Sequence, residues 1–263
     1  MKIRILSGLL MVPFLVFFWL GGRCLIGLCC LIALIGVTEF YNAFKQLGVR
    51  GNRLIGWAGV LALYLIGWFR PDNLRFVLFW LFLFTVCSFL YIFRLERRQP
   101  IDGLVTLAGL IYVGFFSYHL VLLDRLVPAG MVWLVLTGAF GTDIFAYFIG
   151  TAIGRHQLVP SISPKKTVEG AIGGVLGSVL LSGIAGWLLF PHHWHHGLLI
   201  GLLSGIVSQL GDLSASVLKR HLGIKDFGQL IPGHGGILDR FDSIFFTAPV
   251  VYYYALLVFG TAC

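Results

Sequence analysis

Long apolar runs recur from one end of the chain to the other, each bounded by charged or turn-forming residues. A helix needs about 20 apolar residues to cross the hydrocarbon core of a bilayer. Hydrophobic residues make up 58% of the sequence, above the roughly 45–50% of soluble domains. We therefore predict an all-α, polytopic integral membrane helical bundle with about nine transmembrane helices, at residues 5–21, 24–41, 54–69, 76–93, 103–123, 130–152, 170–190, 197–218 and 240–260.

The segments between these runs are too short to form a soluble domain, and no internal repeat is evident. We therefore expect one membrane domain over residues 1–263, with N-terminal spans in 1–128 and the candidate catalytic spans and loops in 129–263. In the first part, Glu39 and Asp102 lie near predicted span ends, where we expect them to reach water as interfacial residues. A catalytic role is the alternative for both.

The formal net charge of +8 comes from basic residues in short segments between the spans. If the N-terminus is cytoplasmic, fifteen of the nineteen Lys and Arg residues fall on that side, and the exceptions are Arg23, Arg70, Arg75 and Arg125. Cytoplasmic loops of membrane proteins carry such an excess of positive charge. We therefore expect a cytoplasmic N-terminus, an external Cys263 and no nucleic-acid partner.

One span carries an acidic residue near its middle. A carboxylate there is costly unless it faces the bundle interior or a wet cavity, and such residues often mark function. The spacing i, i+4, i+7, i+11 places four small or polar residues on one stripe of this helix, namely Asp143, Tyr147, Gly150 and Gly154. We expect Asp143 to face the interior, and a structural hydrogen bond from a protonated carboxyl is the alternative.

Two later spans carry faces of small residues suited to close helix packing. In 170–190 these are Gly170, Gly173, Gly174 and Gly177. In 197–218 the face begins with glycines and becomes polar towards its cytoplasmic end, with Gln209, Asp212 and Ser216. We expect Asp212 to point into the bundle.

The loop between Gly154 and Gly170 carries two adjacent lysines, Lys165 and Lys166. By themselves, adjacent lysines in a cytoplasmic loop are most often topology determinants. Beside Ser163 and the start of a Gly-rich helix they also suit a phosphate clamp, because ammonium groups and helix N-termini both attract anions.

The most polar segment is 216–242, which lies between two apolar spans and contains many glycines, so its backbone can approach a ligand closely. Its charged residues are Lys219, Arg220, Lys225, Asp226, Asp239, Arg240 and Asp242. Asp239 and Asp242 stand at i and i+3 of the last helix, which brings their Cβ atoms to about 5–6 Å. Two carboxylates that close repel unless a proton or cation intervenes. A divalent metal is the natural occupant, since carboxylates together with substrate phosphates commonly hold Mg²⁺.

This segment resembles the signature of the phosphatidate cytidylyltransferases, or CDP-diacylglycerol synthases, which are integral membrane enzymes that join CTP to phosphatidate. The matching residues are Ser216, Leu218, Lys219, Arg220, Lys225, Asp226, Gly228, Ile231, Pro232, His234, Gly235, Gly236, Ile237, Asp239, Arg240, Phe241 and Asp242. A second match runs from Ser163 to Gly170, with Val168 where the family usually has Trp. The resemblance covers the second half of the chain, and the first half is recognisable only as membrane spans.

The resemblance implies that CMP passes from CTP to phosphatidate with release of pyrophosphate and with Mg²⁺ as cofactor. It favours phosphate binding by the paired lysines. The implied catalytic residues are Asp212, Lys219, Arg220, His234, Asp239 and Asp242. The implied substrate-binding residues are Ser163, Lys165, Lys166, Lys225, Asp226, Gly235, Gly236 and Arg240. The implied metal ligands are Asp143, Asp212, Asp239 and Asp242. A phosphate-monoester nucleophile is already anionic, so we favour a positioning role for His234 over that of a general base.

The expected partners are CTP, phosphatidate and the lipid bilayer of the plasma or inner cell membrane, with the active site facing the cytoplasm and a homodimer left open. A CTP-dependent polyprenol kinase or an ether-lipid cytidylyltransferase is the nearest rival, since each also needs a metal, a triphosphate and a membrane acceptor. An ion-coupled transporter would explain Asp143 and Asp212 inside spans, but not the long loop signature.

Overall fold

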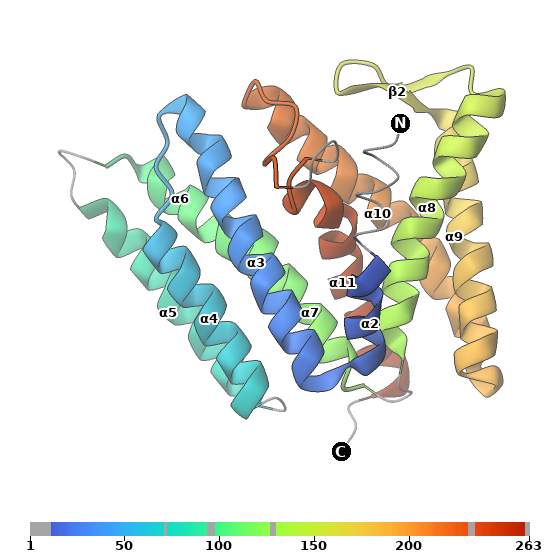
Figure 1. The fold of residues 1–263 in the computed structure, drawn as a ribbon, viewed down its shortest axis with the longest axis horizontal. Helices are drawn as coiled ribbons and strands as arrows, with labels where there is room; N and C mark the ends of the chain where they lie inside the picture. The colour runs from blue at the N-terminus through green and yellow to red at the C-terminus, as the bar shows by residue number, and fades with distance from the viewer. Residues whose placement is uncertain (1–11, 71–72, 94–97, 127–129, 231–234, 261–263) are drawn as a thin grey trace. The chain divides into compact units, whose positions relative to one another are not determined.

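A computed structural model describes residues 12–70, 73–93, 98–126, 130–230 and 235–260 (Figure 1). Helices dominate, which confirms the predicted all-α bundle. Among the described residues, seven helices are long and apolar enough to cross a membrane, and Arg53–Phe69 is a shorter apolar helix. Each predicted span overlaps a helix or a run of consecutive helices, and the first of them overlaps Val12–Leu20, since 5–11 lies outside the described residues. The chain is a multi-pass membrane protein.

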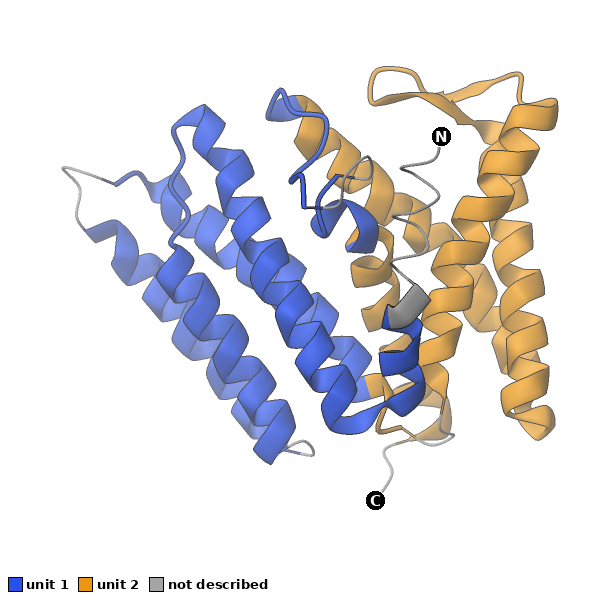
Figure 2. Cartoon of the chain, in the orientation of Figure 1, with its two compact units in different colours: residues 1–122, 221–241 blue, residues 123–220, 242–263 orange. Residues whose placement is uncertain are grey.

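The chain forms two compact units (Figure 2). The first consists of Met1–Leu122 and His221–Phe241, and the second of Leu123–Arg220 and Asp242–Cys263. The polar signature segment is therefore shared, since 216–220 and Asp242 belong to the second unit and 221–241 to the first. The single membrane domain stays a prediction.

Local sequence fixes several helix starts in the first unit. Asn52 caps α4, since its Oδ1 accepts hydrogen bonds from the backbone N–H groups of Leu54 at 2.9 Å and Ile55 at 3.2 Å. Pro100 occupies the first turn of α6, where a missing N–H costs nothing. The helices here are α2 (Val12–Leu20), α3 (Gly22–Phe44), η1 (Lys45–Leu47), α4 (Arg53–Phe69), α5 (Leu74–Leu90), η2 (Tyr91–Phe93), α6 (Pro100–Gly109), the π-helical η3 (Leu110–Phe115) and α7 (Phe116–Leu123).

The second unit contains a small hairpin among its helices. Strands β1 (Gln157–Val159) and β2 (Ser163–Thr167) pair antiparallel, whereas the prolines of this loop predict only that it is not one helix. Figure 1 shows the hairpin beyond the ends of α8 and α9. The helices of the second unit are α8 (Met131–Ile153), α9 (Val168–Leu189), η4 (Pro191–His193), α10 (Trp194–His221) and α11 (Leu238–Phe259), except that the last residue of α10 and the first four of α11 belong to the first unit.

Glycines allow α9 to pack closely against both α8 and α10. A Cβ on Gly174 would lie 2.9 Å from the backbone oxygen of Thr142 in α8. A Cβ on Gly201 of α10 would lie 2.7 Å from the backbone oxygen of Ser178 in α9. The two predicted small-residue faces are therefore confirmed as helix-packing surfaces.

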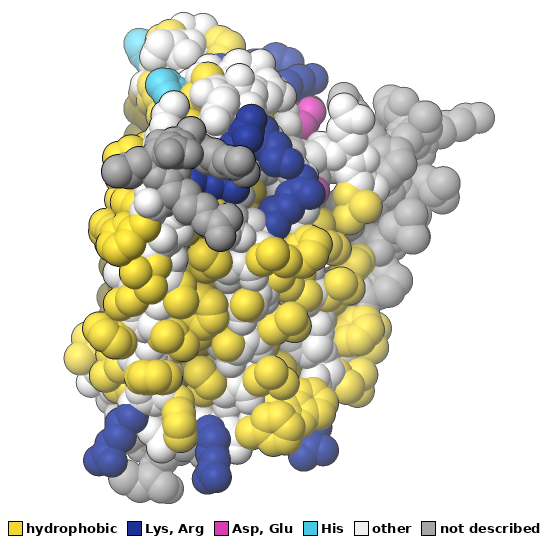
Figure 3. Space-filling model, turned by 90° about the vertical axis from the view of Figure 1, so that its left-hand side faces the viewer, with side chains coloured by type: hydrophobic (Ala, Val, Ile, Leu, Met, Phe, Trp, Pro, Cys, Tyr) yellow, Lys and Arg dark blue, Asp and Glu magenta, His cyan; other side chains and the backbone are white. Residues whose placement is uncertain are grey.

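Many large hydrophobic side chains of the described helices are exposed. Figure 3 shows a broad belt of hydrophobic side chains with Lys and Arg side chains gathered at both ends. Water-soluble proteins seldom expose contiguous apolar patches of more than a few hundred Å². The belt suits contact with lipid tails, and the basic ends suit the headgroup layers.

The expectation that Glu39 and Asp102 reach water is wrong, because the two side chains are only 8% and 3% exposed. Asp102 accepts hydrogen bonds from the backbone N–H groups of Arg50 at 2.6 Å and Gln99 at 3.0 Å. Neighbouring segments thus fold over the helix ends and supply amides in place of water, which makes burial of these carboxylates tolerable.

Candidate active site

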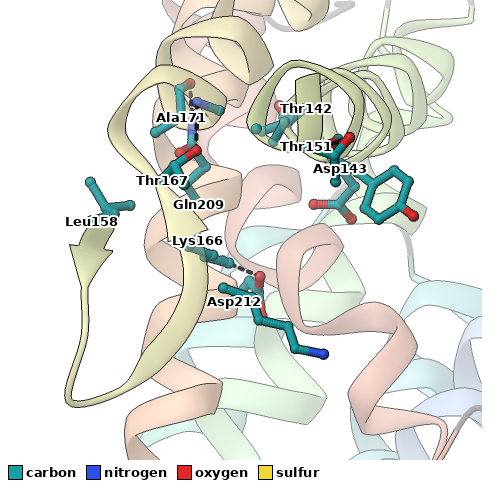
Figure 4. Close-up of a pocket in the computed structure, with 14 residues that line it drawn as sticks. Thr142, Asp143, Thr151, Leu158, Lys166, Thr167, Ala171, Gln209 and Asp212 are labelled. Carbon is teal, nitrogen blue, oxygen red and sulfur yellow. Dashed lines mark hydrogen bonds and ion pairs between the residues drawn. The ribbon is translucent and has the colours of Figure 1, made fainter. Parts of the chain in front are cut away.

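A pocket of about 320 Å³ opens in the second unit, with walls from α8, β2, α9 and α10 (Figure 4). It combines acidic, basic and amide side chains with the apolar surface of the helices. Its polar lining residues are Thr142, Asp143, Tyr147, Thr151, Lys165, Lys166, Thr167, Gln209 and Asp212. Several residues that the sequence singled out separately therefore meet at one place.

The α8 wall carries the stripe predicted from helical spacing. Asp143, Tyr147 and Gly150 all line the pocket, so this part of the prediction is confirmed. Asp143 is exposed at this wall, so it faces an open pocket and not the closed interior of the bundle that we expect from its position on the helix. At Gly150 a Cβ would lie 3.0 Å from the hydroxyl of Thr167, so a small residue lets the end of the hairpin approach α8.

An ion pair crosses the opposite side of the pocket. The ammonium group of Lys166, on β2, donates to the carboxylate of Asp212, on α10 (Figure 4). Both side chains are less than one-third exposed, so water screens the pair only partly. One turn earlier, the side-chain amide of Gln209 donates to the backbone oxygen of Ala171 at 3.1 Å and thereby ties α10 to α9.

The hairpin that presents the lysines is held at its base and at its turn. Glu169 of α9 accepts backbone hydrogen bonds from Arg155 at 3.1 Å and His156 at 3.3 Å. At the turn, Arg220 donates from Nε to the backbone oxygen of Ile162 at 3.1 Å. Arg220 therefore contacts the hairpin, which fixes the position from which the paired lysines reach the pocket.

Asp242 adds a buried carboxylate to the charges of this unit. Its side chain is 7% exposed, and its Oδ1 accepts a hydrogen bond from the backbone N–H of Ser243 at 2.7 Å. It interacts electrostatically with Asp212, Lys219 and Asp143. Asp242 therefore lies within electrostatic range of two further carboxylates and of one lysine.

These residues fit a divalent cation that binds together with its substrate. Among the described residues, no group of three or more His, Cys, Asp or Glu side chains could hold a metal ion by itself. Carboxylates that lie near one another nevertheless attract a cation. Mg²⁺ commonly takes one or two carboxylates and completes its shell with water and substrate phosphates. Asp143, Asp212 and Asp242 provide oxygen donors of that kind.

In the first unit, Glu39 caps the N-terminus of α11. Its Oε1 accepts a hydrogen bond from the backbone N–H of Ile237 at 3.1 Å, and its Oε2 accepts one from Leu238 at 2.8 Å. Gly236 leaves the space for this contact, because a Cβ there would lie 2.5 Å from both carboxylate oxygens. The sequence interpretation missed this role, and its one signal was an acidic residue in an apolar run.

Asp239 organises the preceding loop. Its Oδ2 accepts backbone hydrogen bonds from Phe227 at 2.8 Å and Gly236 at 3.0 Å. Gly235 has a φ of +86°, a conformation that favours glycine, and a Cβ there would lie 3.0 Å from Oδ2 of Asp239 and 3.2 Å from Oδ1 of Asp226. The carboxylate of Asp239 therefore joins the two described parts of this loop, at Phe227 and at Gly236, and its role as a metal ligand stays a prediction.

The remaining predicted residues are not part of the pocket wall. Ser163 lies on β2, where it pairs with Val159. Lys225 is exposed in the loop before α11, and Arg240 is half-buried in the first turn of that helix. His234 lies outside the described residues. The predicted metal pair of Asp239 and Asp242 falls in two different units, so its joint role also stays a prediction.

Comparison with known proteins gives a match over nearly the whole chain. The cytidylyltransferase family matches residues 2–258. A phosphatidate cytidylyltransferase of Synechocystis sp. is 37% identical over 91% of this chain and 90% of its own length. The phosphatidate cytidylyltransferase of Bacillus subtilis is 33% identical over 96% of this chain and 97% of its own length. That of Staphylococcus saprophyticus is 35% identical over 95% of this chain and 97% of its own length. The chain therefore belongs to the cytidylyltransferase family, as the resemblance of its two motifs implied.

Proposed function

We propose that this protein transfers CMP from CTP to phosphatidate, forming CDP-diacylglycerol and pyrophosphate in phospholipid synthesis. Membership of the cytidylyltransferase family supports this, as do the full-length relatives named phosphatidate cytidylyltransferase. The observation that carries the proposal is the pocket of the second unit, which is lined by Lys165 and Lys166 together with Asp143 and Asp212. Basic groups for phosphates and acidic groups for a cation are the two requirements of nucleotidyl transfer.

In the proposed reaction, an oxygen of the phosphatidate phosphate attacks the α-phosphorus of CTP. The bond between the α-phosphorus and the bridging oxygen breaks, and pyrophosphate leaves with its electron pair. The nucleophile is already anionic, so no side chain has to remove a proton. Catalysis then depends on alignment and on stabilising negative charge. Lys165 and Lys166 supply positive charge from the hairpin, which Arg220 and Glu169 hold in place.

Mg²⁺ is the cation that we propose for this site, with Asp212 and Asp242 as ligands and Asp143, which lines the same pocket as Asp212, as a further candidate ligand. When bound, it would supply charge stabilisation at the phosphates. Asp242 is buried beside other carboxylates. Water can therefore do little to stabilise its negative charge, and a bound cation would do so instead. The pocket itself is open, which leaves room for substrate phosphates beside these residues.

The active site is proposed to face the cytoplasm across the plasma or inner cell membrane. The support is the positive-inside distribution, in which fifteen of nineteen basic residues fall on one predicted side. CTP is a cytoplasmic metabolite, so a cytoplasmic pocket would receive it directly.

The test is product analysis with purified protein, Mg²⁺, α-phosphate-labelled CTP and phosphatidate. Label should enter the lipid, and pyrophosphate should appear in equal amount. Asp212→Asn should abolish both signals, whereas Asp124→Asn, an acidic residue outside the pocket lining, should retain them. If a polyprenol or another lipid alcohol becomes phosphorylated with CDP as co-product, while phosphatidate stays unchanged, the protein is a CTP-dependent kinase and the proposal fails.

A further inference from the structure

A second pocket lies in the first unit, where α3 ends, α4 begins and α5 ends. Its volume is about 670 Å³. Four basic side chains line it, and they come from two stretches of chain that are far apart in sequence: Lys45, Arg50, Arg53 and Arg98. None of them belongs to the residues that the proposed reaction uses.

The four positive charges of this pocket exceed the negative charge that the described residues place beside it, which is the single carboxylate of Asp102. No described carboxylate forms an ion pair with any of the four basic side chains. Asp102, near the pocket, is buried, and its two oxygens accept backbone hydrogen bonds from Arg50 and Gln99. Nε of Arg53 is itself buried without a hydrogen-bond partner among the described residues. Four like charges around one cavity favour an anionic occupant.

The basic side chains stand on a fixed scaffold. The backbone of Arg50 is held at both ends, since its N–H donates to Asp102 at 2.6 Å and its carbonyl accepts from the hydroxyl of Tyr91 at 3.1 Å. The guanidinium of Arg98 lies 4.5 Å from the centre of the Tyr91 ring, a cation–π distance. Tyr91 therefore fixes the backbone of one arginine and the side chain of another, so little ordering is needed when an anion binds.

The position of the pocket favours a lipid as the source of that anion. It lies at the ends of apolar helices, on the side that the charge distribution predicts to be cytoplasmic, where basic pockets between helices bind anionic headgroups. Its edge includes Leu54, which is 75% exposed and could contact an acyl chain. A role in setting membrane topology would explain an excess of basic residues on this side. It would not explain why four of them line one cavity whose backbone is held by hydrogen bonds.

We propose that this pocket binds the phosphate headgroup of an anionic membrane phospholipid. The basic side chains pair with the phosphate, and the apolar edge borders the lipid tails. This is a binding site in addition to the catalytic pocket, and it does not depend on the proposed reaction.

The test is native mass spectrometry of the full chain in detergent, titrated with phosphatidylglycerol or with phosphatidylcholine of the same acyl chains. We expect preferential retention of phosphatidylglycerol. Each basic residue near a headgroup contributes about fivefold to binding, so Arg50→Gln and Arg98→Gln should each weaken retention by about that factor. The matched control is Arg75→Gln, because Arg75 lies in the first turn of α5, at the end remote from Tyr91. It should bind like the wild type.

A conservative variant separates charge from folding. Arg50→Lys keeps both the charge and the backbone contacts, so it should retain most of the binding. The proposal is overturned if phosphatidylcholine binds as strongly as phosphatidylglycerol, if Arg75→Gln weakens binding as much as the pocket variants, or if Arg50→Lys behaves like Arg50→Gln. Glycerol phosphate serves as the soluble competitor. If it displaces the lipid at equal concentration, the site recognises free phosphates and the lipid assignment is wrong.

Discussion

Glu39, which lies about 200 positions before α11 in the sequence, accepts hydrogen bonds at the start of this helix. We therefore predict that Glu39 controls the local stability of the start of α11. Two backbone N–H groups, of Ile237 and Leu238, depend on this carboxylate. Glu39→Ala would leave both groups without an acceptor in a buried place. Glu39→Gln would keep one acceptor oxygen and turn an NH₂ group towards the other N–H.

The expected loss follows from the two hydrogen bonds. A hydrogen bond to a charged group contributes about 1.5–3 kcal/mol, so Glu39→Ala should destabilise the start of α11 by about 3–6 kcal/mol. Glu39→Gln should cost about half of that, since one bond is kept. Because every 1.4 kcal/mol is about tenfold in an equilibrium constant, even the milder variant should raise local opening at least about tenfold.

Hydrogen–deuterium exchange read out at the peptide containing Ile237 and Leu238 measures this opening, and CMP transfer measured on the same sample reports the consequence for activity. Asp102→Asn is the matched control, because Asp102 is also a buried carboxylate that accepts two backbone hydrogen bonds, but at the start of α6. It should leave exchange at the start of α11 unchanged. Normal exchange at 237–238 in Glu39→Ala would refute the capping role, as would an equal increase in the Asp102 variant.

Four further outcomes are expected. Asp212→Asn should lower kcat at least about a hundredfold with the protein still folded, because it removes a pocket carboxylate; near-normal turnover at ordinary Mg²⁺ would exclude Asp212 from the site. Lys166→Met should raise the KM for CTP about tenfold or more through loss of a phosphate contact, and an unchanged KM would leave the lysine a topology determinant. Thr167→Ala should lower the unfolding free energy by about 1 kcal/mol, seen as a lower Tm, since its hydroxyl caps α9 by accepting from the N–H of Gly170 at 3.1 Å; an unchanged Tm would contradict this. In a variant without the other four cysteines, Cys263 should react with impermeant thiol reagents on intact cells, and labelling only after membrane opening would overturn the predicted topology.

Features with a local physical cause could be predicted from the sequence. The apolar runs set the helices, because spanning a bilayer requires length and hydrophobicity regardless of fold. The stripe of Asp143, Tyr147 and Gly150 follows from the helical repeat, and the pocket lining confirms it. The family followed from a long gapped motif, because chance agreement over so many positions is improbable.

Only the tertiary structure decided which separate segments meet. Lys166 pairs with Asp212 across 46 positions, and Glu39 binds a backbone N–H that lies 198 positions away. No local pattern encodes such a contact, since it depends on how helices pack and how loops fold over their ends. For the same reason the expectation from the sequence that Glu39 and Asp102 reach water is wrong. Position near a span end sets how close a carboxylate lies to water, whereas the packing of distant segments decides whether water or a backbone amide satisfies it.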